Sequence, residues 1–330
     1  MKDHAYCTYF DSSYLSRGKV LIETLRKQED WGALFVLALD QETLNEVSHW
    51  SDLNVEVISQ AELEKAYPEL IEVQEDRSAM EYVFTLTPWL TLWTLEQVGA
   101  DSWATYLDAD LAFFSSTEPI YEASKDASVT IVEHRFTWEQ AWRRRYGRFN
   151  VAWVGFRNSS DGRACLNWWA ESCLKWCFDR VEGGRFADQR YLDSFPQFPN
   201  VVVVNHPGVD AAPWNLRRHQ VEVGPTGSLT IDRQPLIFFH FHGLRSEGRR
   251  YFFKHLPYLA RTTTAVRERL YRPYCEALWQ IEHGMNSRRA PLSRKRTVLG
   301  HLRLPLDAFL SWIAVKRGDY LDVSGWKLML

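Results

Sequence analysis

The segment ATYLDADL (residues 104–111) runs from apolar residues directly into two acidic ones, Asp108 and Asp110. Its first half predicts a buried strand, and in an open α/β sheet ligands bind outside the carboxyl ends of the strands. Two close carboxylates repel one another, and a hard divalent cation that also binds phosphate oxygens relieves this repulsion. An Asp-x-Asp pair can also lie in a solvated turn, but its position after a predicted buried strand favours a metal site.

The residues before this segment alternate predicted strands with predicted helices. Apolar runs at Ala5–Phe10, Leu34–Leu39 and Val55–Ile58 predict strands, and the periodicity of Arg17–Gln28 and Gln41–Ser48 predicts helices. Fully apolar strands linked by helices are typical of a parallel sheet that is covered on both faces. We therefore expect an α/β fold with a mostly parallel central sheet flanked by helices.

Later segments complete the expected domain and extend it. The predicted helices are Ala79–Gln97, broken or kinked at Pro88, and Leu166–Phe178, and the predicted strands are Ser128–Val132 and Val151–Phe156. After about residue 260 the pattern becomes helical, with one amphipathic helix at Thr264–His283 stopped by Gly284 and an apolar helix at Leu306–Val315.

Two histidines follow another apolar strand. In FFHFHG (residues 238–243), the alternation of a strand would send His240 and His242 to the same face. A lone histidine there would more simply be a satisfied core residue, but two of them, followed by a glycine and Arg245, are typical of a site that closes over an anion. A neutral imidazole can complete a metal shell begun by two carboxylates, and such a shell favours Mn²⁺ over Mg²⁺.

Two further motifs, RFNVA (residues 148–152) and FADQRYL (residues 186–192), lie between these segments. In this order, the four motifs resemble those of A-type nucleotide-sugar glycosyltransferases, especially the retaining family that includes glycogenin and bacterial lipopolysaccharide galactosyltransferases. The resemblance covers about residues 5–255. It implies a single A-type glycosyltransferase domain, a catalytic domain over residues 1–260 that binds the nucleotide sugar. A helical, basic C-terminal extension over residues 261–330 would follow it.

The resemblance also implies a metal and donor site. Asp108, Asp110 and His240 would bind Mn²⁺ (or Mg²⁺) and, with it, the diphosphate of a nucleoside-diphosphate sugar, here UDP-linked. Asn150 would lie beside the donor sugar, although Ala152 stands where the family has glycine. The other donor-binding residues that the resemblance implies are Tyr9, Asp11 and Ser13 near the base, and His242 and Arg245 near the phosphates. The family's lysine position falls on Ser246, so Arg245 or Lys254 would replace it on the leaving phosphate.

The same resemblance gives catalytic roles to Asp188 and Gln189, although Arg190 and Asp193 depart from the family's D-Q-D-x-L-N pattern. Departure of the nucleoside diphosphate leaves a cation-like anomeric carbon, which Asp188 and Gln189 could stabilise or orient. If the reaction inverts configuration, Asp188 would instead be the general base for the acceptor hydroxyl. The resemblance favours retention, and it implies a saccharide or glycolipid acceptor in bacterial surface-polysaccharide or lipopolysaccharide assembly.

The composition narrows the class of protein. With 39 basic and 42 acidic residues, the chain has a net charge of −3, which argues against a protein built to bind polyanions. The opening MKDHAYCTYF has no pattern of a secretory signal, and no stretch is long and apolar enough for a membrane span. Five cysteines in such a chain favour a reducing compartment, so we expect a cytoplasmic enzyme. Cys165, Cys173 and Cys177 lack the spacing of a zinc site and are expected to be buried apolar residues.

The region after Gly284 predicts a contact with membranes. Six basic residues and no acidic ones lie between Met285 and Pro305, namely Arg288, Arg289, Arg294, Lys295, Arg296 and Arg303. The apolar segment with Phe309 and Trp312 follows at once, so we expect this tail to hold the enzyme on the anionic inner face of the plasma membrane. In the alternative, the helix packs on the domain and the arginines face water. The same basic stretch could also bind nucleic acid, but no other feature of the sequence supports that function.

Some alternatives remain at this point. A sugar-phosphate nucleotidyltransferase also uses paired carboxylates, but it needs a glycine-rich basic loop that FDSSYLSRG (residues 10–18) does not supply. A catalytically silent nucleotide-sugar-binding module would have no use for Asp108, Asp110, Asp188 and His240 together. The segment Glu133–Arg135 would bind donor sugar or acceptor, or else form a surface ion pair. Trp214 and Asn215 would border the acceptor or belong to the core.

Overall fold

The computed structural model describes residues 4–28, 32–50, 53–225, 227–286 and 311–325. The chain divides into two compact units, the first made of residues 1–211 with 236–240 and the second of residues 212–235 with 241–330. The chain thus leaves the first unit, returns to it for one short strand, and leaves again. This division into compact units does not fall at residue 260, and a functional boundary there stays a prediction.

The first unit is built on a seven-stranded sheet with the strand order β3-β2-β1-β4-β7-β6-β8. Neighbours from β3 to β4 are parallel, as are β6 and β8, whereas β7 runs antiparallel to both β4 and β6. The strands are β1 (His4–Phe10), β2 (Ala33–Ala38), β3 (Glu56–Ser59), β4 (Trp103–Leu107), β6 (Val129–Glu133), β7 (Phe149–Arg157) and β8 (Val201–Val203). The predicted α/β fold with a mostly parallel central sheet is confirmed. The apolar run of β7 could not reveal its direction, because a buried strand is apolar in either orientation.

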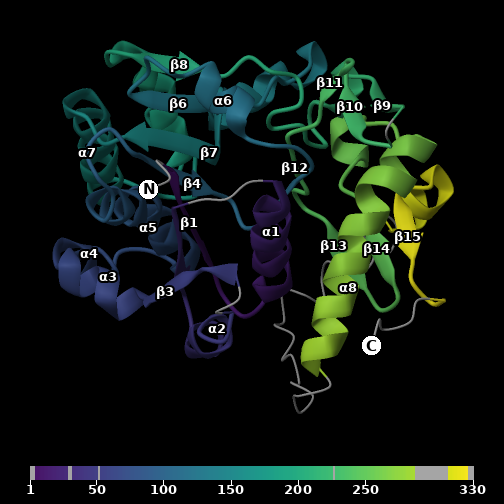
Figure 1. Ribbon diagram of the computed structural model, residues 1–330, viewed down its shortest axis with the longest axis horizontal. Helices are drawn as coiled ribbons and strands as arrows, with labels where there is room; N and C mark the ends of the chain where they lie inside the picture. The colour runs from purple at the N-terminus through teal and green to yellow at the C-terminus, as the bar shows by residue number, and fades with distance from the viewer. Residues whose placement is uncertain (1–3, 29–31, 51–52, 226, 287–310, 326–330) are drawn as a thin grey trace. The chain divides into compact units, whose positions relative to one another are not determined.

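Helices cover both faces of this sheet, with α5 and α7 together on one face and α1 on the other (Figure 1). The helices of the unit are α1 (Leu15–Gln28), α2 (Gln41–Val47), α3 (Gln60–Ala66), α4 (Glu69–Glu72), α5 (Ala79–Glu96), α6 (Glu118–Glu122) and α7 (Ser160–Lys175), with the 3₁₀ helices η2 (Trp138–Tyr146) and η3 (Gln189–Gln197). All five cysteines are buried and free of disulfides, as expected for those of α7.

Helix α5 continues through Pro88, so it is not broken there, and the alternative of a kink at Pro88 stays a prediction. Its start is fixed by a capping box in which Ser78 and Glu81 bond to each other's backbone N–H groups. A proline inside a helix costs about 3 kcal/mol. The apolar surface that α5 buries against the sheet outweighs this cost, because a single buried large side chain contributes about 2 kcal/mol and Leu86, Leu90 and Leu95 are all fully buried.

A second small sheet positions the site. Strand β5 (Leu111–Phe113) pairs antiparallel with β12 (Phe238–His240), and this register sets Leu111 opposite His240. Residues 208–211 run along the other side of β12, where the backbone N–H of His240 donates to the carbonyl of Ala211 at 2.9 Å. Segments that are more than a hundred residues apart in the sequence therefore meet beside Asp110.

The second unit contains two three-stranded antiparallel sheets and a long helix. Its elements are β9 (Val221–Val223), β10 (Leu229–Ile231), β11 (Gln234–Pro235), β13 (Arg245–Glu247), β14 (Arg250–Phe252), β15 (Tyr320–Asp322), the 3₁₀ turns η4 (Leu216–Arg218) and η5 (Leu256–Tyr258), the π-helix η6 (Val266–Tyr271) and α8 (Arg272–Asn286). The predicted amphipathic helix is confirmed, but it runs past Gly284 to Asn286. Residues 311–317 are helical, whereas the start of the predicted helix Leu306–Val315 and the six basic residues lie outside the described residues. Among the described helices, none has the length and apolar character of a membrane span.

Candidate active site

Asp108 and Asp110 lie at the carboxyl end of β4, whose five residues are all buried. The backbone N–H of Leu111 donates to the carbonyl of Asp108 at 3.3 Å, which closes a tight turn between β4 and β5. Tyr106 points to the same face two residues earlier, and its hydroxyl donates to Asp108 Oδ1 at 3.0 Å. The local sequence therefore holds Asp108 by a hydrogen bond from its own strand and holds Asp110 by the turn.

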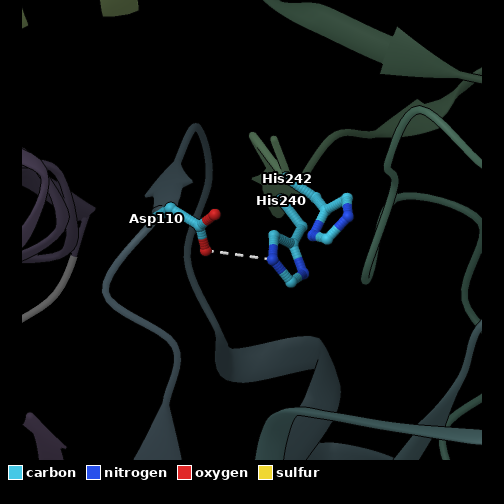
Figure 2. A group of neighbouring side chains, drawn as sticks. All are labelled: Asp110, His240 and His242. Atoms are coloured by element: carbon cyan, nitrogen blue, oxygen red, sulfur yellow. Dashed lines mark ion pairs between the residues drawn. The ribbon is translucent and has the colours of Figure 1, made fainter. Parts of the chain in front are cut away.

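His240 meets both carboxylates. Its Nε2 atom lies 3.0 Å from Asp110 Oδ1 and 3.8 Å from Asp108 Oδ2. Figure 2 shows the side chain of Asp110, from the turn that precedes β5, and that of His240, from β12, directed toward each other. The pairing of β5 with β12 produces this contact, because it sets His240 opposite the residue that follows Asp110.

The electrostatics of the group reflect an excess of acid. Burial raises the pKa of Asp108 to about 6; the charge of His240 opposes this rise, and the charge of Asp110 adds to it. Burial alone would lower the pKa of His240, but the charges of Asp110 and Asp108 and hydrogen bonding to Asp110 and Asp210 raise it well above its usual value. Two partly buried carboxylates are thus held together where their repulsion is only partly relieved.

These residues fit a divalent cation. Two carboxylates and one imidazole are a mixed oxygen and nitrogen donor set, the kind that suits Mn²⁺ better than the all-oxygen shell that Mg²⁺ prefers. Asp110 Oδ1 and His240 Nε2, 3.0 Å apart, are close enough to share one ion, and Asp108 Oδ2 lies 3.8 Å from the same Nε2 atom. Asp108 as a further ligand of that ion stays a prediction. A cation would also relieve the repulsion that raises the pKa of Asp108.

Asp188 and Tyr9 form a second buried group near Asp108. Burial raises the pKa of Asp188 to about 7, and the charge of Asp108 adds to this shift. The Tyr9 hydroxyl lies 3.2 Å from Thr87 Oγ1, and its pKa is raised by burial and then by the charges of Asp188 and Asp108. The structure therefore brings Asp188 and Tyr9 to the same region as the acidic pair.

Gln189 lies at the start of η3, where its side-chain amide donates to the carbonyl of Tyr146 at 2.9 Å. The backbone carbonyl of Asp188 accepts a 2.9 Å hydrogen bond from the indole of Trp169 on α7. The first contact binds the side chain of Gln189 to η2, and the second holds the backbone at Asp188 against α7.

The N-terminal turn lies at the same edge of the sheet. Ser13 donates to Asp11 Oδ1 from its backbone N–H at 3.0 Å and from its hydroxyl at 2.6 Å. The pKa of the nearby Tyr14 hydroxyl is raised by burial and then by the charge of Asp110. Asp11 and Ser13 thus shape the turn, and their contact with a nucleotide base stays a prediction.

His242 and Arg245 belong to the second unit and make their described contacts there. Lys254 Nζ lies 3.0 Å from His242 Nε2. Arg245 pairs with Glu247 at 3.1 Å and donates to the hydroxyl of Ser311 at 2.9 Å. In the same unit, Trp214 and Asn215 are buried, and the Asn215 side chain caps the backbone N–H of Ala212 at 2.9 Å. Binding of donor phosphates by His242 and Arg245 stays a prediction.

The segment Glu133–Arg135 makes contacts within the protein. Glu133 forms an ion pair with Arg148, and Arg135 donates to the carbonyls of Val209 and, at 2.7 Å, His206. His134 stacks on Phe136 and is buried, which lowers its pKa to about 4. Their described contacts are structural, and Arg135 fastens the loop that leads to Asp210.

The sequence analysis did not single out Asp210, which is completely buried beside this site. Asn150 Nδ2 donates to both of its carboxylate oxygens, at 3.0 and 3.2 Å. Asn150 was expected beside the donor sugar, and its side-chain amine is directed to Asp210. Asp210 follows no apolar strand, so only the position of residues 208–211 along β12 reveals it. The one signal in the sequence was an acidic residue in the otherwise apolar GVDAAPW (residues 208–214).

Comparison with known proteins places the chain in a family. No protein-family model matches it. It is 32% identical to the uncharacterised protein YfnF of Bacillus subtilis (strain 168) over 249 residues, which cover 73% of this chain and 82% of that protein. The chain therefore belongs to the same family as YfnF.

Among solved structures, the chain is similar to mouse xyloside xylosyltransferase 1, with 13% identity, a TM-score of 0.45 and coverage of 73% of this chain and 98% of that one. It is also similar to the galactosyltransferase LgtC in complex with donor and acceptor sugar analogues. The identity is 15% and the TM-score 0.44, and the match covers 72% of this chain and 87% of LgtC.

Proposed function

We propose that this protein is a metal-dependent glycosyltransferase that moves a sugar from a nucleoside-diphosphate donor, UDP-linked, to a saccharide or glycolipid acceptor. The observation that supports it most directly is the meeting of Asp108, Asp110 and His240 at the carboxyl end of β4. This edge is where α/β sheets bind ligands. A divalent cation would relieve the repulsion within this partly buried group, which has more acidic than basic side chains. The diphosphate of a nucleotide sugar would supply further oxygen ligands to that cation.

Asp108, Asp110 and His240 would hold Mn²⁺ (or Mg²⁺), which as a Lewis acid stabilises the negative charge that develops on the departing diphosphate. The residues of the chain orient the donor. Tyr106 holds Asp108 by a hydrogen bond, and the turn after β4 holds Asp110. Tyr9, Asp11, Ser13 and Asn150 on the first unit, and His242 and Arg245 on the second, are the proposed donor contacts.

Asp188 is the proposed catalytic carboxylate, with Gln189 beside it. Breaking the bond to the anomeric carbon leaves positive charge on the sugar, and an ionised Asp188 would stabilise that charge. Burial holds the pKa of Asp188 near 7, so the neighbouring positive charge of the transition state would favour its ionised form. We propose retention of configuration, from the resemblance to the retaining family.

The test is a screen for donor hydrolysis. The full chain is incubated with Mn²⁺ and each of a panel of nucleotide sugars, and release of the nucleoside diphosphate is measured with and without EDTA. We expect Mn²⁺-dependent release from at least one UDP-sugar. Release of pyrophosphate from a nucleoside triphosphate and a sugar phosphate would favour a nucleotidyltransferase instead. Binding of nucleotide sugars without turnover in any acceptor mixture would favour a silent binding module.

We further propose that the enzyme acts in bacterial surface-polysaccharide or lipopolysaccharide assembly, at the cytoplasmic face of the membrane. The support is the run of six basic residues between Met285 and Pro305, each worth about 1 kcal/mol near an anionic surface. Within the described residues, Trp312 is exposed and could add interfacial anchoring. Full-length protein should sediment with phosphatidylglycerol vesicles at low salt, and a variant with glutamine at the six positions should not. Equal sedimentation of both proteins would contradict membrane binding by this tail.

A further inference from the structure

Asp210 is a buried carboxylate that the proposed mechanism does not use. Its side chain is completely buried, and its backbone has a φ angle of 51°, in the left-handed region that non-glycine residues adopt at a cost. A carboxylate removed from water is unfavourable unless its surroundings compensate for it. The protein therefore keeps an unfavourable group in an unfavourable backbone conformation next to its candidate active site.

The contacts of Asp210 lead to His240. Asp210 Oδ1 lies 3.8 Å from His240 Nδ1, on the side of the imidazole ring away from Asp110. Asn150 Nδ2 lies between the two residues, since it donates to Asp210 and is also 3.3 Å from His240 Nδ1. Asn150 is itself fixed, because its Oδ1 accepts from the backbone N–H of Ala152 at 3.3 Å.

A purely structural role explains this arrangement less well. The segment 208–211 is already bound to β12 through its backbone, since Gly208 O accepts from Ile237 N at 2.8 Å and Ala211 O accepts from His240 N at 2.9 Å. Arg135 binds the carbonyls just before Asp210. A neutral asparagine at position 210 would fill the same space without placing a third carboxylate beside Asp108 and Asp110.

We propose that Asp210, which Asn150 holds in place, is a positioning residue: its carboxylate faces Nδ1 of His240 and fixes the imidazole ring with Nε2 facing Asp108 and Asp110. Histidines that bind metals generally interact through their other ring nitrogen with a carboxylate or carbonyl, which holds the ring in place. This inference rests on the proposed function, because it assigns the role of Asp210 within the same metal site. It predicts that Asp210 controls the affinity and the selectivity for the ion without binding the ion itself.

The test compares Asp210→Asn with wild type in Mn²⁺ and Mg²⁺ titrations of the full chain, followed by calorimetry. Loss of such a partner weakens metal binding by about 10- to 100-fold. We expect that loss for Mn²⁺ and a smaller one for Mg²⁺, because a site that loses its nitrogen ligand keeps two carboxylates, which Mg²⁺ accepts. A merely structural role would not change the ratio of the two affinities.

A matched control is Asp319→Asn in the second unit, where Asp319 is also buried at 1% exposure. It should lose stability and keep its Mn²⁺ affinity. If Asp210→Asn does not fold, Asn150→Ser provides a second variant. We expect it too to lose more affinity for Mn²⁺ than for Mg²⁺. In the wild type, electron spin echo spectra of bound Mn²⁺ should show coupling to an imidazole nitrogen, and the variants should lose it.

The outcomes separate the two proposals. If wild type binds Mn²⁺ and Asp210→Asn binds it equally well with the same preference over Mg²⁺, the positioning role is overturned while the proposed function stands. If wild type binds neither ion, with or without UDP, the proposed function fails and the positioning role fails with it.

Discussion

His240 in the first unit and His255 in the second are both buried histidines that face carboxylates, yet the pKa of one is raised and that of the other is lowered. Around His240, the charges of Asp110 and Asp108 and hydrogen bonding to Asp110 and Asp210 overcome the effect of burial and raise the pKa. Around His255, burial lowers the pKa to about 4, because the charge of Arg317 opposes that of the single carboxylate Asp319.

The contacts of the two histidines differ in the same way. Both ring nitrogens of His255 lie within hydrogen-bond distance of hydroxyls, at 2.8 Å from Thr262 and 2.9 Å from Tyr271. Asp319 is paired with Arg317 at 2.6 Å. This second group is balanced in charge and holds the unit together. His240 instead stands among several acids whose repulsion is not relieved, which is the property of a binding site.

The comparison predicts the largest effect at Asp188, a buried carboxylate near Asp108 in the first unit. Asp188→Asn should lower turnover by about 100-fold or more, since loss of one charged group that stabilises a transition state has an effect of this size. Donor affinity should barely change. Steady-state kinetics with the donor found in the hydrolysis screen will measure both quantities. A variant that loses donor affinity but keeps its turnover would show that Asp188 binds the donor instead.

In the second unit, we expect loss of a carboxylate to affect stability and to leave metal binding unchanged. Asp319→Ala removes a buried carboxylate whose partner Arg317 is 34% exposed, and it should lower the free energy of unfolding by about 2 kcal/mol, measured by urea denaturation. Its Mn²⁺ affinity should equal that of wild type, because the group around His255 has no excess of acid. A stable Asp319→Ala variant that had lost Mn²⁺ binding would reverse the roles of the two groups.

The last prediction concerns how stability depends on pH, and it tests whether burial raises the pKa of Asp188. Its pKa is raised to about 7 in the folded protein, above the unfolded value near 4, so the folded state keeps a proton that the unfolded chain loses. Metal-free wild type should therefore lose stability as the pH rises from about 4 to 7, relative to Asp188→Asn. The difference should grow through this range and stay constant above about pH 7. A difference that does not vary with pH would show that folding does not raise the pKa of Asp188.

Much of the fold and part of the site could be predicted from the sequence, for a common physical reason. Asp108 and Asp110 follow the buried strand β4, and β12, which ends at His240, meets them because it pairs with β5. Asp210 could not be found this way, because its position depends on how residues 208–211 lie along β12. The hydrogen bond from the Asn150 side chain to Asp210 could not be predicted either, because it depends on the same position of residues 208–211. Local patterns also could not show that packing carries α5 through Pro88 or that β7 is antiparallel.

The central claim is that Asp108, Asp110 and His240 hold a divalent cation through which a nucleoside diphosphate binds. Calorimetric titration of UDP into the full chain, with saturating Mn²⁺ or with EDTA, tests this most directly in wild type and in Asp110→Ala. The account predicts UDP binding to wild type only in the presence of Mn²⁺, and no Mn²⁺-dependent binding to a folded Asp110→Ala variant. Equal UDP affinity in Mn²⁺ and EDTA, or in wild type and variant, would contradict it.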